Sequence, residues 1–189
     1  MLSRHEVLAS VCSFLDRDDL SGAADHLRRE YPFTPGESVE RKYGDQQALR
    51  VFIRDGFVDR YSGARLVFPG VLRIIALRFP VEFPYHPNWK MTETHLAFWE
   101  LSPTVDHVVP IARGGEDAEH NWVTTSMVRN SAKANWTLDE LGWRLLPLGD
   151  LQAWDGLLSW FKQYVARHPE LLQHARIAAW HRAALLVAV

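Results

Sequence analysis

An adjacent Asp106-His107 pair stands at the end of a short apolar segment, and Pro110 and a Gly114-Gly115 turn follow it. Asn121 opens the next apolar segment, and Asn130 comes a little further along the chain. These side chains bring one carboxylate, one imidazole and two amides into a short stretch of sequence. Groups of this kind bind metals and transfer protons, so this stretch is the strongest candidate for a reactive centre.

Asp106 and Asn130 carry the oxygen atoms that a hard divalent cation prefers. Mg²⁺ keeps several water ligands and takes only one or two protein groups, so this pair would be a sufficient minimal set. A cation held there can stabilise the phosphate oxygens and the leaving group during phosphodiester hydrolysis. The two residues therefore predict a site for one divalent cation, Mg²⁺ or Mn²⁺.

His107 is then free to act as a general base, because the pKa of a histidine lies close to working pH. Consecutive strand residues point to opposite faces, so Asp106 and His107 share a site only where the strand ends or is distorted. The nearby Pro110 is consistent with a loop or bulge at that point. Across a hairpin, the Asn121 amide is expected to hold the imidazole in one tautomer.

Two cations follow the same pattern. Lys133 lies three residues after Asn130, on the same face of a predicted helix, and Arg113 precedes the glycine turn. Both are candidates to contact a nucleic-acid phosphate or the charge that develops on it. The alternative for Lys133 is an ordinary solvated lysine.

The elements around these residues are predicted from hydrophobic pattern and turn signals. Strands are expected at 104–111 and 121–125, and a helix at 126–134. Upstream, 57–67 reads as a hairpin that turns near 62–63, whereas the apolar run 71–77 has no clear assignment. Thr137 and Glu140 form a capping box for a short helix that ends at Gly142.

Three zones are expected along the chain: an N-terminal helical extension (1–36), a central domain (37–150, with its core at 104–134) and a C-terminal helical extension (151–189). Ser3 and Glu6 form a capping box for a first helix, and a second helix must stop before Pro32. Residues 37–54 are expected to be helical, with a strand at 49–53 as the alternative. The predicted fold class is α+β.

This arrangement resembles the HNH endonuclease family, also called the ββα-metal or His-Me finger family. The resemblance rests on Val105-Asp106-His107-Val108-Val109-Pro110, Arg113-Gly114-Gly115, Asn121-Trp122-Val123 and Asn130-Ser131-Ala132-Lys133. It covers about 30 residues densely and about 85 loosely if the upstream hairpin is included.

The resemblance implies a ββα-metal core that hydrolyses phosphodiester bonds in DNA. It also implies that His107 activates the water, that Asp106 and Asn130 hold one divalent cation, and that Asn121 braces His107. Many relatives have two Cys-x-x-Cys pairs around a structural zinc ion. This chain has a single cysteine, Cys12, so no structural zinc is expected.

Composition limits the other possibilities. The net charge is −2, but residues 41–78 hold eight basic and three acidic residues, a local excess of +5 that favours a DNA partner or forms a solvated face. One cysteine fits a reducing, cytoplasmic setting, and no membrane association is expected. The helical extensions could support a homodimer. Two alternatives remain open: a non-catalytic nucleic-acid- or protein-binding module on the same fold, and an antibacterial effector nuclease.

Overall fold

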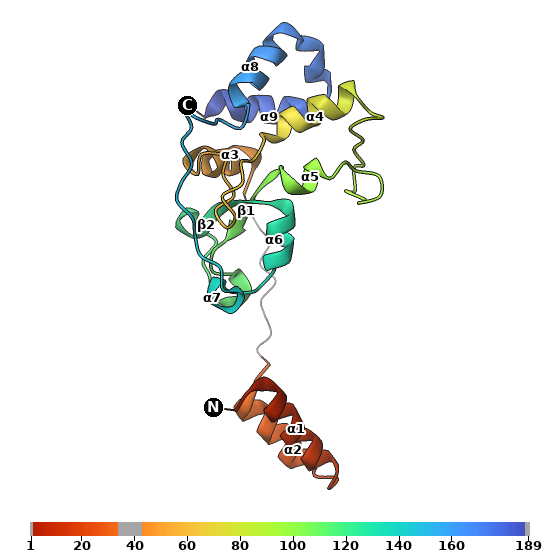
Figure 1. The fold of residues 1–189 in the computed structure, drawn as a ribbon, viewed down its shortest axis with the longest axis vertical. Coiled ribbons are helices and arrows are strands. Elements are labelled where there is room, and N and C mark those ends of the chain that lie inside the picture. The colour runs from red at the N-terminus through yellow and green to blue at the C-terminus, as the bar shows by residue number, and fades with distance from the viewer. Residues whose placement is uncertain (1, 34–42, 188–189) are drawn as a thin grey trace. The chain divides into compact units, whose positions relative to one another are not determined.

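The computed structural model of the chain describes residues 2–33 and 43–187. The chain divides into two compact units, Met1–Glu37 and Ser38–Val189, and each is described by itself (Figure 1). The helix predicted at 37–54 has its first six positions, 37–42, outside the described residues. Arg41 and Lys42 of the basic segment also lie outside them.

The first unit is a pair of helices, α1 (Arg4–Leu15) and α2 (Leu20–Glu30). The Glu6 carboxylate accepts a 2.7 Å hydrogen bond from the backbone N–H of Ser3, which satisfies one of the free donors at the start of α1. Helix α2 ends before Pro32, as predicted. Both helices are confirmed.

The second unit mixes helices with one small sheet, so the α+β class is confirmed at that level. Its α-helices are α3 (Asp45–Arg54), α4 (Pro69–Arg78), α5 (Ala97–Glu100), α6 (Met127–Lys133), α7 (Leu138–Leu141), α8 (Leu158–Arg167) and α9 (Ala175–Leu186). Its 3-10 helices are η1 (Ile111–Arg113), η2 (Glu119–Asn121) and η3 (Pro169–Gln173), and its strands are β1 (Pro103–His107) and β2 (Trp122–Ser126). In the described residues, no helix combines the length and the apolar character that crossing a bilayer requires.

Aromatic side chains from four helices fill the core of this unit. The Phe68 ring, at the start of α4, lies 4.9 Å from the Phe161 ring of α8 and 5.4 Å from the Trp180 ring of α9. Phe52 of α3 belongs to the same cluster. Helices α8 and α9 therefore share one core with α3 and α4, and do not form the separate extension expected at 151–189. The unassigned run 71–77 is helical because Pro69 suits the first turn of α4.

Strands β1 and β2 pair antiparallel, with Asp106 opposite Val123 and His107 opposite Trp122. β1 is shorter than predicted, because the chain leaves the sheet after His107 and turns into η1 at Pro110. Helix α6 follows β2 directly, and the Ser126 hydroxyl accepts from the N–H of Arg129 at its start. The segment 57–67 is a tight turn with a single bridge, Val58 to Arg65, rather than two full strands.

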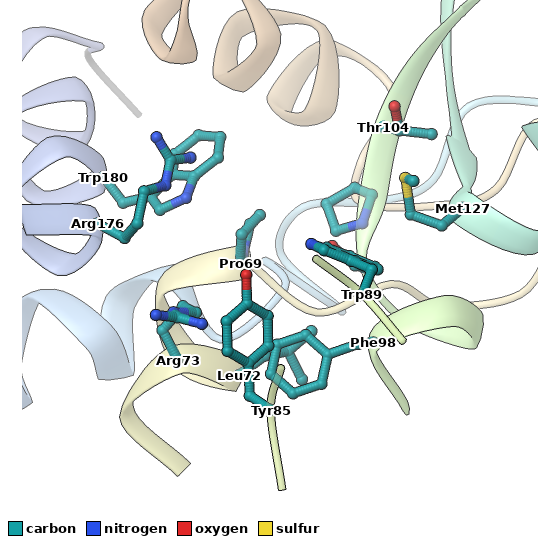
Figure 2. Close-up of a pocket in the computed structure, with 12 residues that line it drawn as sticks. Pro69, Leu72, Arg73, Tyr85, Trp89, Phe98, Thr104, Met127, Arg176 and Trp180 are labelled. Carbon is teal, nitrogen blue, oxygen red and sulfur yellow. The ribbon is translucent and has the colours of Figure 1, made fainter. Parts of the chain in front are cut away.

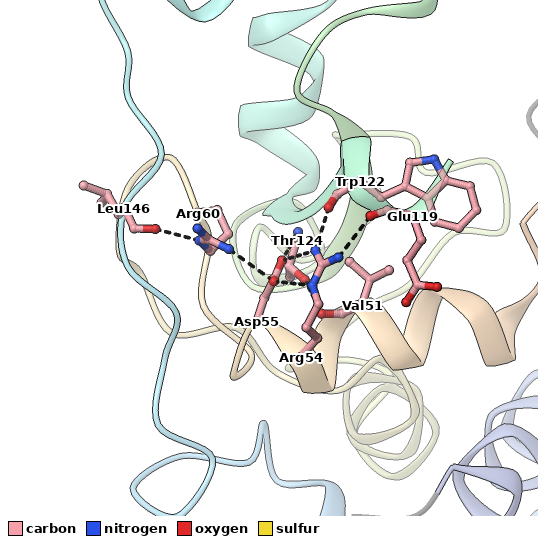
Figure 3. Close-up of polar contacts among 8 residues, drawn as sticks. All are labelled: Val51, Arg54, Asp55, Arg60, Glu119, Trp122, Thr124 and Leu146. Atoms are coloured by element: carbon pink, nitrogen blue, oxygen red, sulfur yellow. Dashed lines mark hydrogen bonds and ion pairs between the residues drawn. The ribbon is translucent and has the colours of Figure 1, made fainter. Parts of the chain in front are cut away.

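Two fully buried acids cover the outer edge of β2. The Asp55 carboxylate accepts from the backbone N–H of Thr124 at 2.7 Å, and the Asp59 carboxylate accepts from the N–H of Ser126 at 2.9 Å. Arg54 and Arg60 both pair with Asp55, at 2.9 and 3.2 Å (Figure 3). An unpaired strand edge leaves donors without partners, and these carboxylates satisfy them. Part of the basic excess at 41–78 is thus neutralised internally.

Candidate active site

Asp106 lies at the centre of a buried polar cluster. Its Oδ2 atom accepts a 2.7 Å hydrogen bond from the Tyr61 hydroxyl and lies 2.9 Å from the Lys133 ammonium. The Lys133 Nζ also donates to the backbone oxygen of His107, at 2.7 Å. Burial and the neighbouring Asp106 charge raise the pKa of Tyr61, so its hydroxyl remains a donor.

The position of Lys133 corrects the role expected for it. Its side chain is 0% exposed, and its ammonium is committed to Asp106 and to the β1 backbone. A lysine in this position cannot reach a substrate phosphate without leaving the core. Lys133 instead holds α6 against β1, and it compensates the charge of Asp106 in a region of low dielectric.

His107, on the last residue of β1, has different partners. Its Nε2 atom lies 2.8 Å from Asp117 Oδ1, and the Trp122 indole nitrogen lies 3.0 Å from both atoms. Because two acceptors repel each other at 2.8 Å, we assign the hydrogen to His107 Nε2, which then donates to the Asp117 carboxylate. The Trp122 N–H then donates to Asp117. In the neutral imidazole this tautomer leaves the lone pair on Nδ1.

In the described part of the chain, Asn121 makes no hydrogen bond to the imidazole, which corrects the expected bracing contact. Its Oδ1 accepts from the N–H of Val109, and its Nδ2 donates to the backbone oxygens of Val109 and Glu116, all at 2.9 Å. The amide therefore closes the loop between the two strands. A Cβ atom on Gly115 would lie 1.9 Å from the Val109 oxygen, so only glycine fits at this point of the loop.

The loop in turn places Asp117. Asn121 binds the backbone oxygen of Glu116, the residue next to Asp117. The amide therefore acts on His107 indirectly: it fixes the loop, and the loop positions the Asp117 carboxylate beside the imidazole. Second-shell groups commonly fix a histidine tautomer in this way, although here a carboxylate performs the task assigned to the amide.

Asn130 and Arg113 have different partners. Asn130 Nδ2 lies 3.4 Å from the Val105 oxygen and 3.5 Å from Thr104 Oγ1, against the middle of β1. Arg113 is half-exposed in the loop, with Glu140 of α7 3.4 Å away. The structure thus brings Asp106, Lys133 and Asn130 to the β1–α6 junction, and gives His107 and Arg113 separate partners.

The oxygen atoms at this junction suit a hard cation in their chemistry. Among the described residues, Asp106 Oδ1 and Asn130 Oδ1 receive no hydrogen bond, whereas Asp106 Oδ2 is committed to Lys133 and Tyr61. One carboxylate oxygen and one amide oxygen, completed by water, match the sparse protein coordination of Mg²⁺. The described part of the chain contains no group of three His, Cys, Asp or Glu side chains placed to hold a metal.

Three residues of this region were not foreseen from the sequence: Asp117, Tyr61 and Trp122. The first two lie in turns whose paths depend on the fold. The third depends on the register: the predicted strands, paired from the loop inward, would place Trp122 opposite Pro110, whereas the structure places it opposite His107. The position of Asp117 was also informative: a loop between paired strands returns to the strand end that it left, so an acid within it can lie beside His107.

Comparison of the chain with models of known protein families, with curated proteins and with solved structures finds no significant match in any of the three.

Proposed function

We propose that this chain is a metal-dependent endonuclease of the HNH type that hydrolyses phosphodiester bonds in DNA, with His107 as the general base. The observation that carries the proposal is the contact between His107 Nε2 and Asp117 Oδ1, beside Asp106 on a strand–strand–helix unit. The order Asp106-His107, Asn121, Asn130 along that unit is the order that suggested the family resemblance.

The chemistry follows from the tautomer of His107. Asp117 accepts the Nε2 hydrogen, so Nδ1 is the ring atom that would take a proton from a water molecule entering beside this buried side chain. The negative charge of Asp117 also stabilises the imidazolium that forms when that proton arrives. A carboxylate that orients a histidine in this way is a recurring device in hydrolases.

Asp106 and Asn130 are the groups that would hold the cation, through the two oxygens without hydrogen-bond partners among the described residues. A bound Mg²⁺ or Mn²⁺ supplies charge stabilisation to the phosphate oxygens and the leaving group. Because Lys133 already compensates the charge of Asp106, the protein alone offers weak attraction for a cation. Substrate phosphate oxygens are expected to complete the site, as is usual for Mg²⁺.

A nicking assay on supercoiled plasmid tests the proposal. Wild-type protein is expected to nick DNA with Mg²⁺ or Mn²⁺ and to be silent with a chelator. His107→Ala is expected to lower the rate by about 10²–10⁴-fold, the usual contribution of a general base. His120→Ala is the matched control, because this exposed histidine contacts only Glu116, at 3.4 Å, among the described residues.

Nicking that persists in the chelator, or that His107→Ala leaves unchanged, contradicts the mechanism. A fully inactive protein under all cation conditions contradicts the function itself.

One observation favours a second candidate, a non-catalytic DNA-binding module. The Asp106 carboxylate is already satisfied on Oδ2 by Lys133 and Tyr61, as expected of a group that stabilises a fold. Under this reading, DNA binding measured by fluorescence anisotropy is the same with Mg²⁺ and with chelator, and no nicking accompanies it.

A further inference from the structure

A pocket of about 190 Å³ opens between helices α4 and α9 on one side and β1 with the start of α6 on the other (Figure 2). Its walls include the aromatic rings of Tyr85, Trp89 and Phe98, and its charged lining residues are Arg73 and Arg176. Pockets for drug-sized ligands typically measure about 300–1,000 Å³, so this smaller pocket suits a single planar base.

Arg73 is the unusual residue of this pocket. Its guanidinium stacks on Tyr85, with Cζ 3.6 Å from the ring centroid (Figure 2). Its Nη1 atom is buried and has no hydrogen-bond partner among the described residues, and no described carboxylate pairs with the group. Burial lowers the pKa of Arg73, and the nearby Arg176 charge lowers it further. A buried guanidinium nitrogen without an acceptor is costly, and an anion in the pocket would relieve that cost.

Arg176 contributes less to the charge of the pocket. It pairs with Asp45 through two contacts of 3.2 and 3.3 Å, and this leaves Arg73 as the uncompensated cation. The lining residues include no acid. The pocket therefore combines one available positive charge with several aromatic faces.

Trp89 gives the pocket part of its shape. Its backbone has a φ of 51°, in the left-handed region that a bulky residue rarely adopts. The ring packs edge-on against Phe98, with centroids 5.8 Å apart. The chain thus accepts backbone strain at a residue that supplies one of the aromatic faces of the wall.

We infer that this pocket binds one unstacked nucleotide of a DNA strand, with its phosphate on Arg73 and its base against the rings around Trp89. Aromatic stacking combined with guanidinium contacts is the usual chemistry of single-strand recognition. The pocket also adjoins the candidate active site: Thr104 lines it, and Asn130 Nδ2 lies 3.5 Å from Thr104 Oγ1. The inference rests on the proposed function, because it takes the bound strand to be the substrate.

Equilibrium binding of a short single-stranded oligonucleotide with one 2-aminopurine, in chelator so that nothing is cleaved, tests the inference. Trp89→Ala is expected to weaken binding by about 5–100-fold, the range that loss of one stacked base gives. Arg73→Gln is expected to weaken binding and to reduce the slope of log affinity against log salt by about 0.7, the value for one phosphate on a single strand. Arg65→Gln is the matched control, because Arg65 also lies over an aromatic ring, that of Trp154, outside the pocket.

Unchanged binding in folded Arg73→Gln and Trp89→Ala proteins overturns the inference, and so does equal affinity for a strand that is abasic at the probe position. Circular dichroism shows whether each variant folds. Since Trp89 is only partly buried, its variant keeps the test decisive if Arg73→Gln misfolds. Binding that depends on Arg73 in a protein that never nicks DNA would support the pocket and reject the nuclease. Nicking by a protein whose binding does not depend on Arg73 would support the nuclease and reject the pocket.

Discussion

The Lys133 ammonium donates to the backbone oxygen of His107 at 2.7 Å, so a residue of α6 fixes the strand position of the candidate base. The same ammonium pairs with Asp106. One buried cation therefore links the strand that carries the proposed chemistry to the helix that carries Asn130.

Lys133→Met tests this link. The substitution shortens the side chain by one atom and leaves Asp106 buried without its cation, which is expected to cost about 3–5 kcal/mol. Urea unfolding gives the free energy. Lys90→Met is the control, because Lys90 and Glu93 form an exposed pair worth at most about 1 kcal/mol. A loss as small as that of the control would mean that the pair does not stabilise the fold. Adding Asp106→Asn to Lys133→Met is expected to recover part of the loss.

Asp117→Asn tests the tautomer of His107. An amide is nearly the same size and still accepts from Trp122, so the fold is expected to persist. The nicking rate is expected to fall by about 10²–10⁴-fold, because the amide neither fixes the Nε2 hydrogen nor stabilises the imidazolium. Glu116→Gln is the control, since Asn121 binds the backbone oxygen of Glu116, and the exposed Glu116 carboxylate pairs with His120 rather than with His107. Equal rates for both variants would remove Asp117 from the mechanism.

Tyr61 predicts a specific dependence of stability on alkaline pH. Burial, followed by the Asp106 charge, raises the pKa of its hydroxyl in the folded protein. The contribution of Tyr61 to stability is therefore complete below the pKa of tyrosine in the unfolded chain, about 10, and declines as pH rises above it. Tyr61→Phe is expected to cost about 1.5–3 kcal/mol at neutral pH through the lost hydrogen bond. It should also remove this part of the alkaline decline.

Unfolding free energies measured from about pH 7 to about pH 11 would show the effect, because this range brackets the pKa of tyrosine in the unfolded chain. Tyr31→Phe, at an exposed position, is the control. A decline of the same size in Tyr61→Phe and wild-type protein would contradict the prediction.

Gly115→Ala tests the loop that carries Asp117. The added methyl would meet the Val109 oxygen at 1.9 Å, so the backbone must move, at an expected cost of about 1–3 kcal/mol. Nicking is expected to fall as well, because the loop positions the partner of His107. Gly44→Ala is the control: a Cβ there has open space around it, and the change of helix cap costs about 1 kcal/mol or less. Thermal unfolding and nicking rates of both variants provide the comparison.

Local signals in the sequence were enough to predict the strand–strand–helix unit. Pro110 and the glycines mark the loop, and Ser126 marks the start of α6. The partners of the reactive side chains were harder to predict, because they depend on how distant segments meet. Lys133 has the spacing of an exposed helical cation, and only the packing of α6 on β1 and on the turn at Tyr61 makes it a buried one.

The acids of the central segment show the same limit. Asp55 and Asp59 were counted as charges that offset neighbouring arginines. In the structure, both are fully buried and bind amides of β2, a strand that begins more than 60 positions later in the sequence. Residue type and spacing do not reveal that a carboxylate will accept a hydrogen bond from a backbone amide far away in the sequence.

The covered edge of β2 also matters for how copies of this protein meet. A two-stranded sheet normally offers free backbone groups on which a strand from another molecule can add, the first step towards aggregates. Here Asp55 and Asp59 occupy donors along β2, while Tyr43 and Asn130 approach the Val105 oxygen on β1, at 3.5 and 3.4 Å. Side chains thus limit the sheet to two strands. Few backbone donors and acceptors at its edges are left to pair with a strand from another molecule.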